Sequence, residues 1–409
     1  MFVAWRDLRF AKGRFALMGT VIVLITVLVG LLSGLTAGLG RENTSAITSL
    51  PADRLAFAAP ADGGDDVSFT DSHVAKRTWE GWAGAPGVRS AEPLGIGTAK
   101  ATAGAGPGQR TAALSAFGVR PGSHLAPEAR RIADGSAVLS AKAADELGVR
   151  AGGSFTLNGR TLTAAAVAGE AMYSHTPVVW TSLDDWAALS GGARSGGAGA
   201  GSGGPGTANG GSEAGSGGSA ASGGSGGGAG AAPGRAGTGG AETATVVALS
   251  TSSDAGLAAA DRRLGTRTVT TGDALRAIGS YTAENGSLQL MRGFLFAISA
   301  LVIGAFFTVW TIQRSGDVAV LKALGAPTRY LLRDALGQAV VLLVIGTGAG
   351  TALAASAGAA VGGTVPFVLD PATVLVPALV MIALGAVGAA LSIRRITAVD
   401  PLTALGSAR

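Results

Sequence analysis

The chain has no cysteine, only three tyrosines and few charged side chains. Charged residues make up 14% of its 409 residues, whereas soluble domains are usually about a quarter charged. Without cysteine the chain cannot form a disulfide framework, a thiolate metal site or a cysteine nucleophile. Hydrophobic residues reach 47%, and the mean hydropathy is +0.41. This composition is typical of a membrane protein rather than of a soluble domain.

Charge is missing altogether from four long stretches. No Asp, Glu, Lys or Arg occurs in residues 15–40, 293–313, 335–369 and 371–393. About 20 apolar residues are enough to cross the hydrocarbon core of a bilayer as a helix. The sequence therefore predicts an α-helical integral membrane protein with four transmembrane helices, at 15–39, 293–312, 336–362 and 372–393. The absence of ionisable groups from these spans argues against ion- or proton-coupled secondary transport.

The basic residues around the spans predict the orientation. Lys and Arg are enriched in the cytoplasmic segments of membrane proteins, and eleven of them lie in residues 1–14, 313–335 and 394–409. Both termini and the middle loop are therefore predicted to be cytoplasmic, and residues 40–290 extracytoplasmic, in a multi-pass protein of the plasma membrane. Alternatively, the first span is a cleaved signal peptide, but its 26 uncharged residues exceed the usual length of a signal-peptide core.

The net charge of +5 has the same origin. The predicted cytoplasmic segments carry 11 Lys and Arg against 4 Asp and Glu, whereas the rest of the chain carries 20 against 22. The excess of positive charge therefore reflects topology. The predicted environment is a lipid bilayer, and no nucleic-acid partner is expected.

The long segment 40–290 is predicted to be an α+β domain with an insert. Residues 190–240 contain 24 Gly among 51 residues, a composition that predicts a flexible, disordered loop. Outside the insert, turn and capping residues separate short periodic segments. They predict strands at 111–117, 177–181 and 244–249, a hairpin around Asn158-Gly159, and helices at 141–147, 183–189 and 255–264. Residues 273–284 are predicted to be helical and to lead into the second span like a stalk.

This domain shows no recognisable catalytic or metal-binding pattern. Its three histidines, His73, His124 and His175, are far apart in the sequence, and we interpret them as isolated surface residues. The phosphate-binding pattern G-x-x-x-x-G-K-[ST] does not occur, so the chain is not expected to hydrolyse ATP itself. We predict that it has no catalytic residue, no cofactor and no metal site, and that it is not an enzyme.

Small residues recur at four-residue spacing in two of the predicted spans. Such a pattern allows helix backbones to approach closely, although Gly and Ala are also simply abundant in this chain. A helix-packing seam, within one chain or between two copies, is predicted along Gly30, Gly34, Gly38, Gly346, Gly350, Ala354 and Gly358.

The cytoplasmic loop 313–335 contains a predicted amphipathic helix. Its apolar residues Val318, Leu321 and Leu324 recur every three positions, which places them on one face. Gly325 followed by Pro327 is typical of a helix end. A loop that only anchors the topology would not need an apolar face, so we interpret this helix as a docking element for a cytoplasmic partner.

The loop sequence QRSGDVAVLKALGA at 313–326 resembles the R-x-x-E-I-x-x-L-x-A-L-G-A signature of MacB/FtsX-like ABC transporter permeases. Asp317 and Val318 stand where Glu and Ile are usual. Weaker similarities occur in an amphipathic helix at 1–14 before the first span, in the outer domain at 117–148, and in the tail at 394–405. The order of one span, a MacB-like periplasmic core domain and three spans is also that of the family.

The resemblance implies a half-transporter that pairs with a second permease, in a homodimer or a heterodimer, and with a separate cytoplasmic ABC ATPase that binds the ATP. Closure of the ATPase would move the outer domain by mechanotransmission, for export or extrusion at the outer face. The implied ATPase-coupling residues are Arg314, Asp317, Val318, Leu321, Lys322, Leu324, Gly325 and Ala326.

Two other functions remain open from the sequence. An FtsX-like signalling subunit would use the same coupling to activate an extracytoplasmic protein partner, such as a cell-wall hydrolase, without transport. A membrane-anchored adhesion or sensor protein would have no ATPase. The sequence names no substrate.

Overall fold

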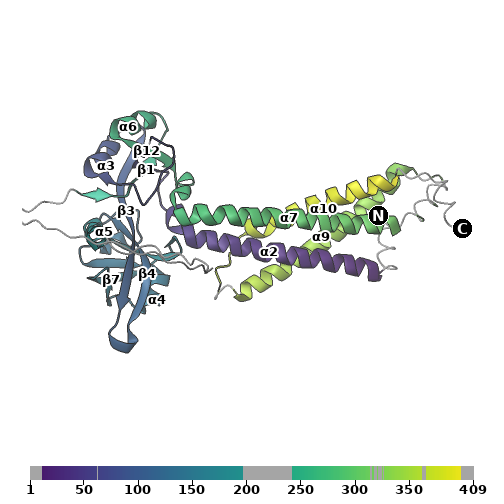
Figure 1. Ribbon diagram of the computed structural model, residues 1–409, viewed down its shortest axis with the longest axis horizontal. Helices are drawn as coiled ribbons and strands as arrows, with labels where there is room; N and C mark the ends of the chain where they lie inside the picture. The colour runs from purple at the N-terminus through teal and green to yellow at the C-terminus, as the bar shows by residue number, and fades with distance from the viewer. Residues whose placement is uncertain are drawn as a thin grey trace, which may run out of the picture.

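The computed structural model describes residues 12–61, 63–196, 242–313, 316, 320, 325, 327–361 and 365–397. A β-sheet domain lies at one end of an elongated helical bundle (Figure 1). Within the described residues, four helices are long and apolar enough to span a membrane. They are α2 (Lys12–Thr48), α7 (Gly279–Gln313), α9 (Thr328–Val361) and α10 (Pro371–Thr397). The domain lies between the first and second of them in the chain, so the predicted fold class is confirmed.

Helices α2 and α7, like α9 with its 34 residues, are longer than a membrane requires. Helix α2 has 37 residues and α7 has 35, which at 1.5 Å per residue gives each a length of about 50–55 Å. The hydrocarbon core is only about 30 Å thick. The apolar run of α2 ends at the charged residues Arg41 and Glu42. The helix itself continues to Thr48, because a helix can extend from the membrane into water. Both helices therefore extend beyond the apolar spans to the β-sheet domain (Figure 1).

Ten strands of the described chain form one sheet in the order β12-β1-β11-β3-β4-β9-β5-β7-β6, with β8 paired to β9. A separate pair is formed by β2 and β10. The strands are β1 (Arg54–Ala58), β2 (Val74–Ala75), β3 (Val88–Ala103), β4 (Arg110–Val119), β5 (Ser136–Leu139), β6 (Ser154–Leu157), β7 (Arg160–Val167), β8 (Met172–Tyr173), β9 (Thr176–Ser182), β10 (Thr243–Ala244), β11 (Val246–Thr251) and β12 (Thr266–Thr270).

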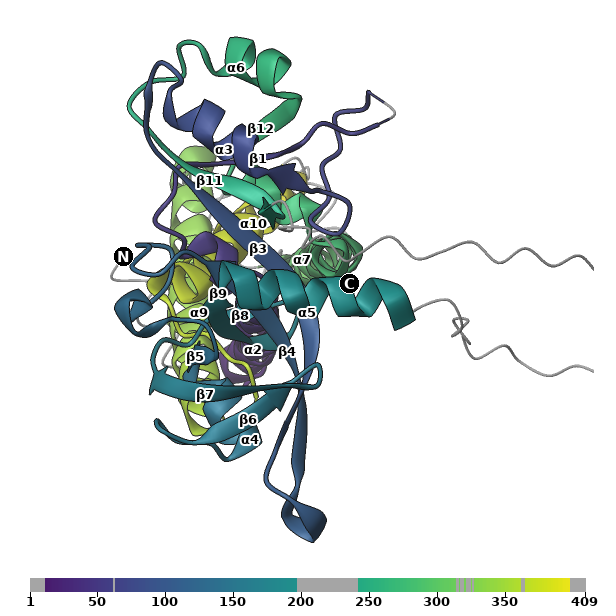
Figure 2. The ribbon, with the colours of Figure 1, turned by 90° about the vertical axis from the view of Figure 1, so that its left-hand side faces the viewer.

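The long strand β3 divides the sheet into two lobes. Its first half pairs with β11 and its second half with β4. Beyond β4 the sheet closes on itself, because β6 pairs back onto β3. Helices α3 (Lys76–Ala83) and α6 (Leu257–Leu264) belong to the open lobe, and α4 (Ala141–Leu147) and α5 (Leu183–Gly196) to the closed lobe (Figure 2). Short 3₁₀ turns complete the domain at Gly106–Gly108, Ala129–Arg131 and Asp273–Ala277.

Local residue choices explain several element boundaries. The Ser140 hydroxyl accepts a hydrogen bond from the Ala143 N–H, and Gly148 ends α4 at a φ of +65°, as capping rules require. Asn158 and Gly159, at φ values of +44° and +84°, make the tight turn between β6 and β7 that such a pair favours. The predicted hairpin and α4 are therefore confirmed.

Three elements differ from the prediction. Helix α5 continues to Gly196, seven residues into the predicted insert, because a capped and packed helix propagates cooperatively. The strand predicted at 244–249 is broken at Thr245, whose hydroxyl accepts the Ile96 N–H at 2.8 Å. The stalk predicted from residue 273 begins as a 3₁₀ turn and becomes α-helical at Gly279. Residues 1–11 of the predicted first helix and 197–241 of the insert lie outside the described residues.

Candidate functional site

Most of the predicted ATPase-coupling segment lies outside the described residues. This is so for Arg314, Asp317, Val318, Leu321, Lys322, Leu324 and Ala326. Gly325 is described, in a turn with a φ of +90°, a backbone conformation that favours glycine. Helix α9 begins soon after, at Thr328. The coupling role of this segment stays a prediction.

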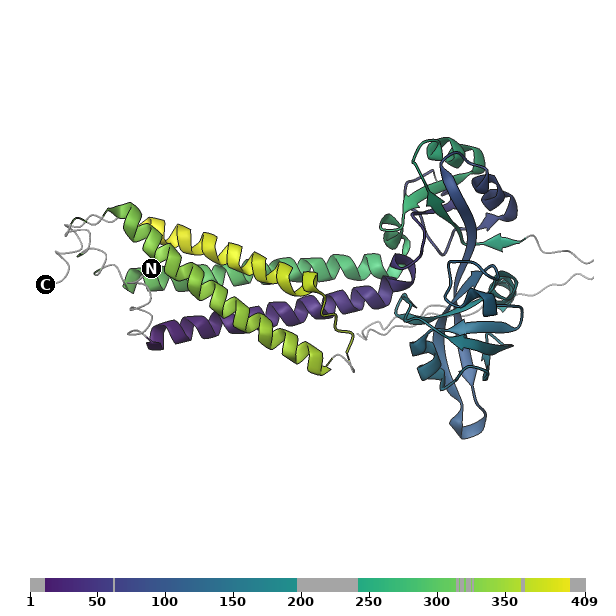
Figure 3. The same ribbon diagram turned by 180° about the vertical axis from the view of Figure 1, so that it is seen from behind.

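Helices α2 and α9 cross each other (Figure 3), and part of the predicted packing seam lies at their contact. A Cβ atom added at Gly30 would lie 2.8 Å from the Ala354 Cβ, and one at Gly350 would lie 2.6 Å from the Thr26 Cβ. Carbon atoms in ordinary contact are about 3.5–4.0 Å apart. Gly346 meets the Ile22 side chain in the same way, at 2.8 Å. Glycine therefore sets the distance between these two helices within one chain.

The remaining glycines of the seam contact the loop between α9 and α10 instead of a helix. A Cβ at Gly34 or Gly358 would overlap the Phe367 ring, and one at Gly38 would overlap the Pro366 carbonyl. The Val368 N–H donates a hydrogen bond to the Gly34 carbonyl at 3.2 Å. The Phe367 ring packs on these glycines and thus fixes the connection between α9 and α10 against α2 and α9.

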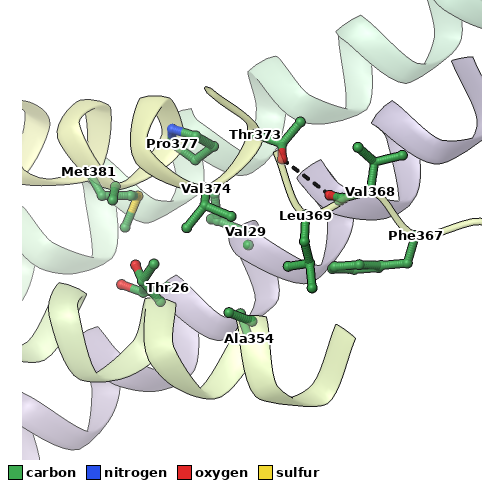
Figure 4. A pocket seen from close by; sticks show the side chains of 15 residues that line it. Thr26, Val29, Ala354, Phe367, Val368, Leu369, Thr373, Val374, Pro377 and Met381 are labelled. Atoms are coloured by element: carbon green, nitrogen blue, oxygen red, sulfur yellow. Dashed lines mark hydrogen bonds between the residues drawn. The ribbon is translucent and has the colours of Figure 1, made fainter. Parts of the chain in front are cut away.

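A small cavity lies beside the Phe367 ring, between α2, α9 and α10 (Figure 4). Its volume is about 20 Å³, and it is lined by residues such as Val29, Ala354, Pro377 and Met381. This is room for about one water molecule. The cavity is therefore too small to hold a substrate.

The two stalk helices meet the domain in a polar cluster that we call the stalk junction. It consists of Glu42, Asn43 and Ser45 on α2, Ser280 and Glu284 on α7, and Ser174 and His175 in the turn between β8 and β9. Asn43 is at its centre and only 1% exposed. Its Nδ2 atom lies 3.1 Å from His175 Nε2 and 3.4 Å from Glu284 Oε2. Its Oδ1 atom accepts a hydrogen bond from the Ser280 hydroxyl at 2.9 Å.

Further contacts tie α7 to the same turn. His175 Nε2 lies 2.8 Å from Glu284 Oε2, and the hydroxyls of Ser174 and Ser280 are 2.9 Å apart. Each of the three segments at the junction therefore contacts the other two. Movement of either stalk has to move the turn or break these contacts.

The turn itself has an unusual backbone. Ser174 and His175 have φ values of +50° and +62°, which cost non-glycine residues about 1–2 kcal/mol each. The Ser174 N–H donates to the Asn43 carbonyl at 2.9 Å, and the His175 N–H to the Glu42 carbonyl at 3.3 Å. The end of α2 therefore stabilises a strained turn, and that turn leads directly into β9, which lies inside the sheet between β4 and β5.

His124 and His175 contradict the interpretation of the histidines as isolated surface residues. His175 belongs to the stalk junction, and His124 Nδ1 lies 2.7 Å from Glu92 Oε1. The partners Asn43 and Glu284 are 132 and 109 residues away from His175, so no local sequence signal could have joined them. Within the described residues no group of three or more His, Cys, Asp or Glu residues is arranged to hold a metal ion.

Comparisons with known proteins agree with this architecture. A model of the MacB-like periplasmic core domain matches residues 15–202, and a model of the FtsX-like permease C-terminal domain matches residues 290–401. The chain belongs to the MacB/FtsX-like family of ABC transporter permeases. The predicted family is confirmed.

Among individual relatives of this permease is a protein named as a putative hemin transport system permease, HrtB, from Staphylococcus epidermidis. It is 32% identical over 142 residues, which are 35% of this chain and 41% of the relative. An uncharacterized ABC transporter permease from Mycobacterium tuberculosis is 30% identical over 130 residues, 29% of this chain and 34% of the relative. The matched part thus spans less than half the length of these relatives.

Two solved structures show a weak similarity to this chain. The extracellular domain of the noncanonic ABC-type transporter YknZ from Gram-positive bacteria gives a TM-score of 0.31 at 10% identity, covering 53% of this chain and 97% of that domain. The periplasmic region of MacB from Actinobacillus actinomycetemcomitans gives 0.29 at 9% identity, covering 57% and 95%.

Proposed function

We propose that this permease transmits movement from a separate cytoplasmic ATPase to its extracytoplasmic domain. The observation that carries the proposal is the path of α2 and α7. Each is one continuous helix that contains an apolar span and ends in the stalk junction. A helix is stiff along its axis, so displacement at one end reaches the turn between β8 and β9 at the other.

The orientation in the membrane is part of this proposal. The basic residues of 1–14, 313–335 and 394–409 favour a cytoplasmic location for these segments, so the ATPase would dock on the loop 313–335 and bind the ATP itself. A second permease chain, identical or different, would complete the transporter. The uncharged spans and the very small cavity beside Phe367 favour export by movement of the outer domain over passage through the bundle.

Co-purification tests the docking. The tagged full chain, expressed in its own host and extracted in mild detergent, is expected to retain a cytoplasmic ATPase that mass spectrometry identifies. The double variant Leu321→Asp and Leu324→Asp places two charges on the predicted apolar face and is expected to lose it. The matched control Ala319→Asp and Ala323→Asp places the same two charges on the opposite side of the predicted helix, so it is expected to keep the ATPase. Retention by the double variant, or loss from the control, would contradict the docking face.

Movement is tested with a spin label. Because the chain has no cysteine, Thr111→Cys on the exposed start of β4 gives one label per chain. The label-to-label distance in the assembled transporter is expected to change between the nucleotide-free and the vanadate-trapped complex. An unchanged distance, with ATP hydrolysis intact, would refute the transmission of movement.

The named relatives suggest hemin as the first substrate to examine. Cells that lack this permease are expected to become sensitive to hemin, and the full chain to restore growth. Equal sensitivity of both strains would exclude hemin extrusion. It would leave the signalling role as the alternative if the spin-label distance still changes.

A further inference from the structure

The extracytoplasmic domain contains a second, larger hollow that the transmission of movement does not use. This cleft has a volume of about 620 Å³ and lies between the two lobes. Its lining includes Phe69, Ile96, Gly97, Tyr173 and Trp186. On one side it is bounded by α5, which lies across the sheet (Figure 2). The volume is in the range of sites that hold drug-sized molecules.

The cleft has a rigid aromatic wall. Tyr173 is held edge-on between Phe69 and Phe117, with ring centroids 5.8 and 5.7 Å away. Burial raises the pKa of the Tyr173 hydroxyl well above its usual range, so the hydroxyl stays neutral. Among the described lining residues, none is Asp, Glu, Lys or Arg, and the polar ones are hydroxyls, an amide and His73. Such a surface favours an uncharged aromatic ligand over an ion, because a charged ligand would lose its hydration without gaining a counter-charge.

One hydrogen-bond donor in this wall has no acceptor within the described part of the chain. Trp186 is only 5% exposed, and none of the described residues accepts a hydrogen bond from its Nε1 atom. The indole lies against Gly95 and Gly118, where a Cβ atom would collide with it, so the ring cannot turn away. A Cβ at Gly97 would lie 3.4 Å from Nε1, which places this N–H beside a residue that lines the cleft. A buried donor without an acceptor is unfavourable, and a ligand that carries an acceptor would remove that cost.

We propose that this cleft binds an uncharged aromatic molecule of drug-like size that carries a hydrogen-bond acceptor. The acceptor receives the Trp186 N–H, and the aromatic part packs against Tyr173 and Phe69. A peptide of a partner protein is the competing occupant, and to bind as an added strand it would need a long unpaired strand edge. The described residues that line the cleft provide no such edge, since β2 and β10 are paired with each other. The site is separate from the ATPase-coupling loop, so ligand binding can be tested independently of the proposed transmission of movement.

Photolabelling of the full chain in lipid nanodiscs tests the proposal. The probe is benzophenone, a neutral aromatic ketone whose carbonyl accepts a hydrogen bond and inserts into nearby C–H bonds on irradiation. Mass spectrometry of the digest is expected to find saturable labelling of peptides that contain residues 69–73, 96–99 and 186–190. Labelling confined to the four spans would overturn the proposal.

Two pairs of variants separate binding from damage to the fold. Trp186→Phe removes the N–H and keeps a ring, and it is expected to weaken labelling of the cleft about fivefold, the effect of one lost hydrogen bond. Trp82→Phe is its control, since Trp82 Nε1 is also buried and has no partner among the residues that the structure describes, but Trp82 does not line the cleft. Thr98→Lys puts a charge into the cleft at an exposed position and is expected to abolish labelling, whereas Thr111→Lys on the neighbouring strand is not. Undiminished labelling of both cleft variants would refute the site.

The charge of the ligand is tested with 4-benzoylbenzoate, the anionic analogue of the probe. It is expected to label the cleft peptides much less than benzophenone does. Equal labelling by the anion would refute the assignment to uncharged ligands. Protection of the cleft by an added extracytoplasmic protein, without saturable labelling by benzophenone, would favour a peptide occupant instead.

Discussion

Asn43→Ala is the sharpest test of the stalk junction. The substitution removes the contacts of the side chain with His175, Glu284 and Ser280, at 3.1, 3.4 and 2.9 Å. At about 1 kcal/mol net for each good hydrogen bond, and little for the longest one, the loss is about 2 kcal/mol. His175 keeps its contact with Glu284, and Ser280 keeps its contact with Ser174, so the junction should loosen without unfolding the domain.

Hydrogen exchange measures this loosening directly. The amides of Ser174 and His175 donate to carbonyls of α2, so they exchange when the turn separates from the stalk. A loss of about 2 kcal/mol raises their exchange rate about 30-fold. The control is Asn158→Ala, which removes a hydrogen bond to the Lys100 N–H in the outer hairpins and should leave both amides unchanged. Unchanged exchange in the Asn43 variant would show that the side chain does not hold the turn.

Two further predictions concern the bundle and the outer domain. Gly350→Leu should lower the melting temperature of the purified protein, because a Cβ atom at this position would already lie 2.6 Å from the Thr26 Cβ. Gly348→Leu on the same helix is the control, since a Cβ atom there has no described atom within 4 Å. Equal melting temperatures of the two variants would argue against the seam. In an alkaline absorbance titration, Tyr173 should ionise only above the ordinary tyrosine pKa of about 10, since burial raises its pKa. The stability that its neutral hydroxyl provides is therefore complete below pH 10 and falls as the pH rises above it. The Tyr173→Phe variant should lack this late transition, and a titration that the substitution leaves unchanged would contradict the prediction.

Parts of the fold that depend on neighbouring residues could be predicted from the sequence. Ser140 and Gly148 bound a helix because capping is a contact between residues three or four positions apart. The hairpin at Asn158-Gly159 follows from the backbone angles that these two residues tolerate. Helix α5 extends past its predicted end to Gly196, because the prediction relied on the glycine content of the following segment, and a helix once formed can continue through glycine at a modest cost.

The candidate site was harder to predict because its partners are distant in the chain. The small residues of the seam can be recognised in the sequence by their four-residue spacing. Their contact with Phe367 cannot be recognised in this way, since this ring belongs to a loop without a periodic pattern. His175 gives no signal by itself. Its role comes from a turn that is brought between the ends of two helices.

By itself, the sequence determined the membrane character, the number and order of the spans and the family, because these depend on composition along the chain and on a short local motif. The tertiary structure decided how the stalks are attached to the domain and where the cleft lies. Asn43, His175 and Glu284 meet only when the sheet has folded between α2 and α7. Likewise, the indole of Trp186 lies against Gly95 and Gly118 only because the folded domain brings α5 against β3 and β4. Such contacts depend on distances in space, which residue order alone does not specify.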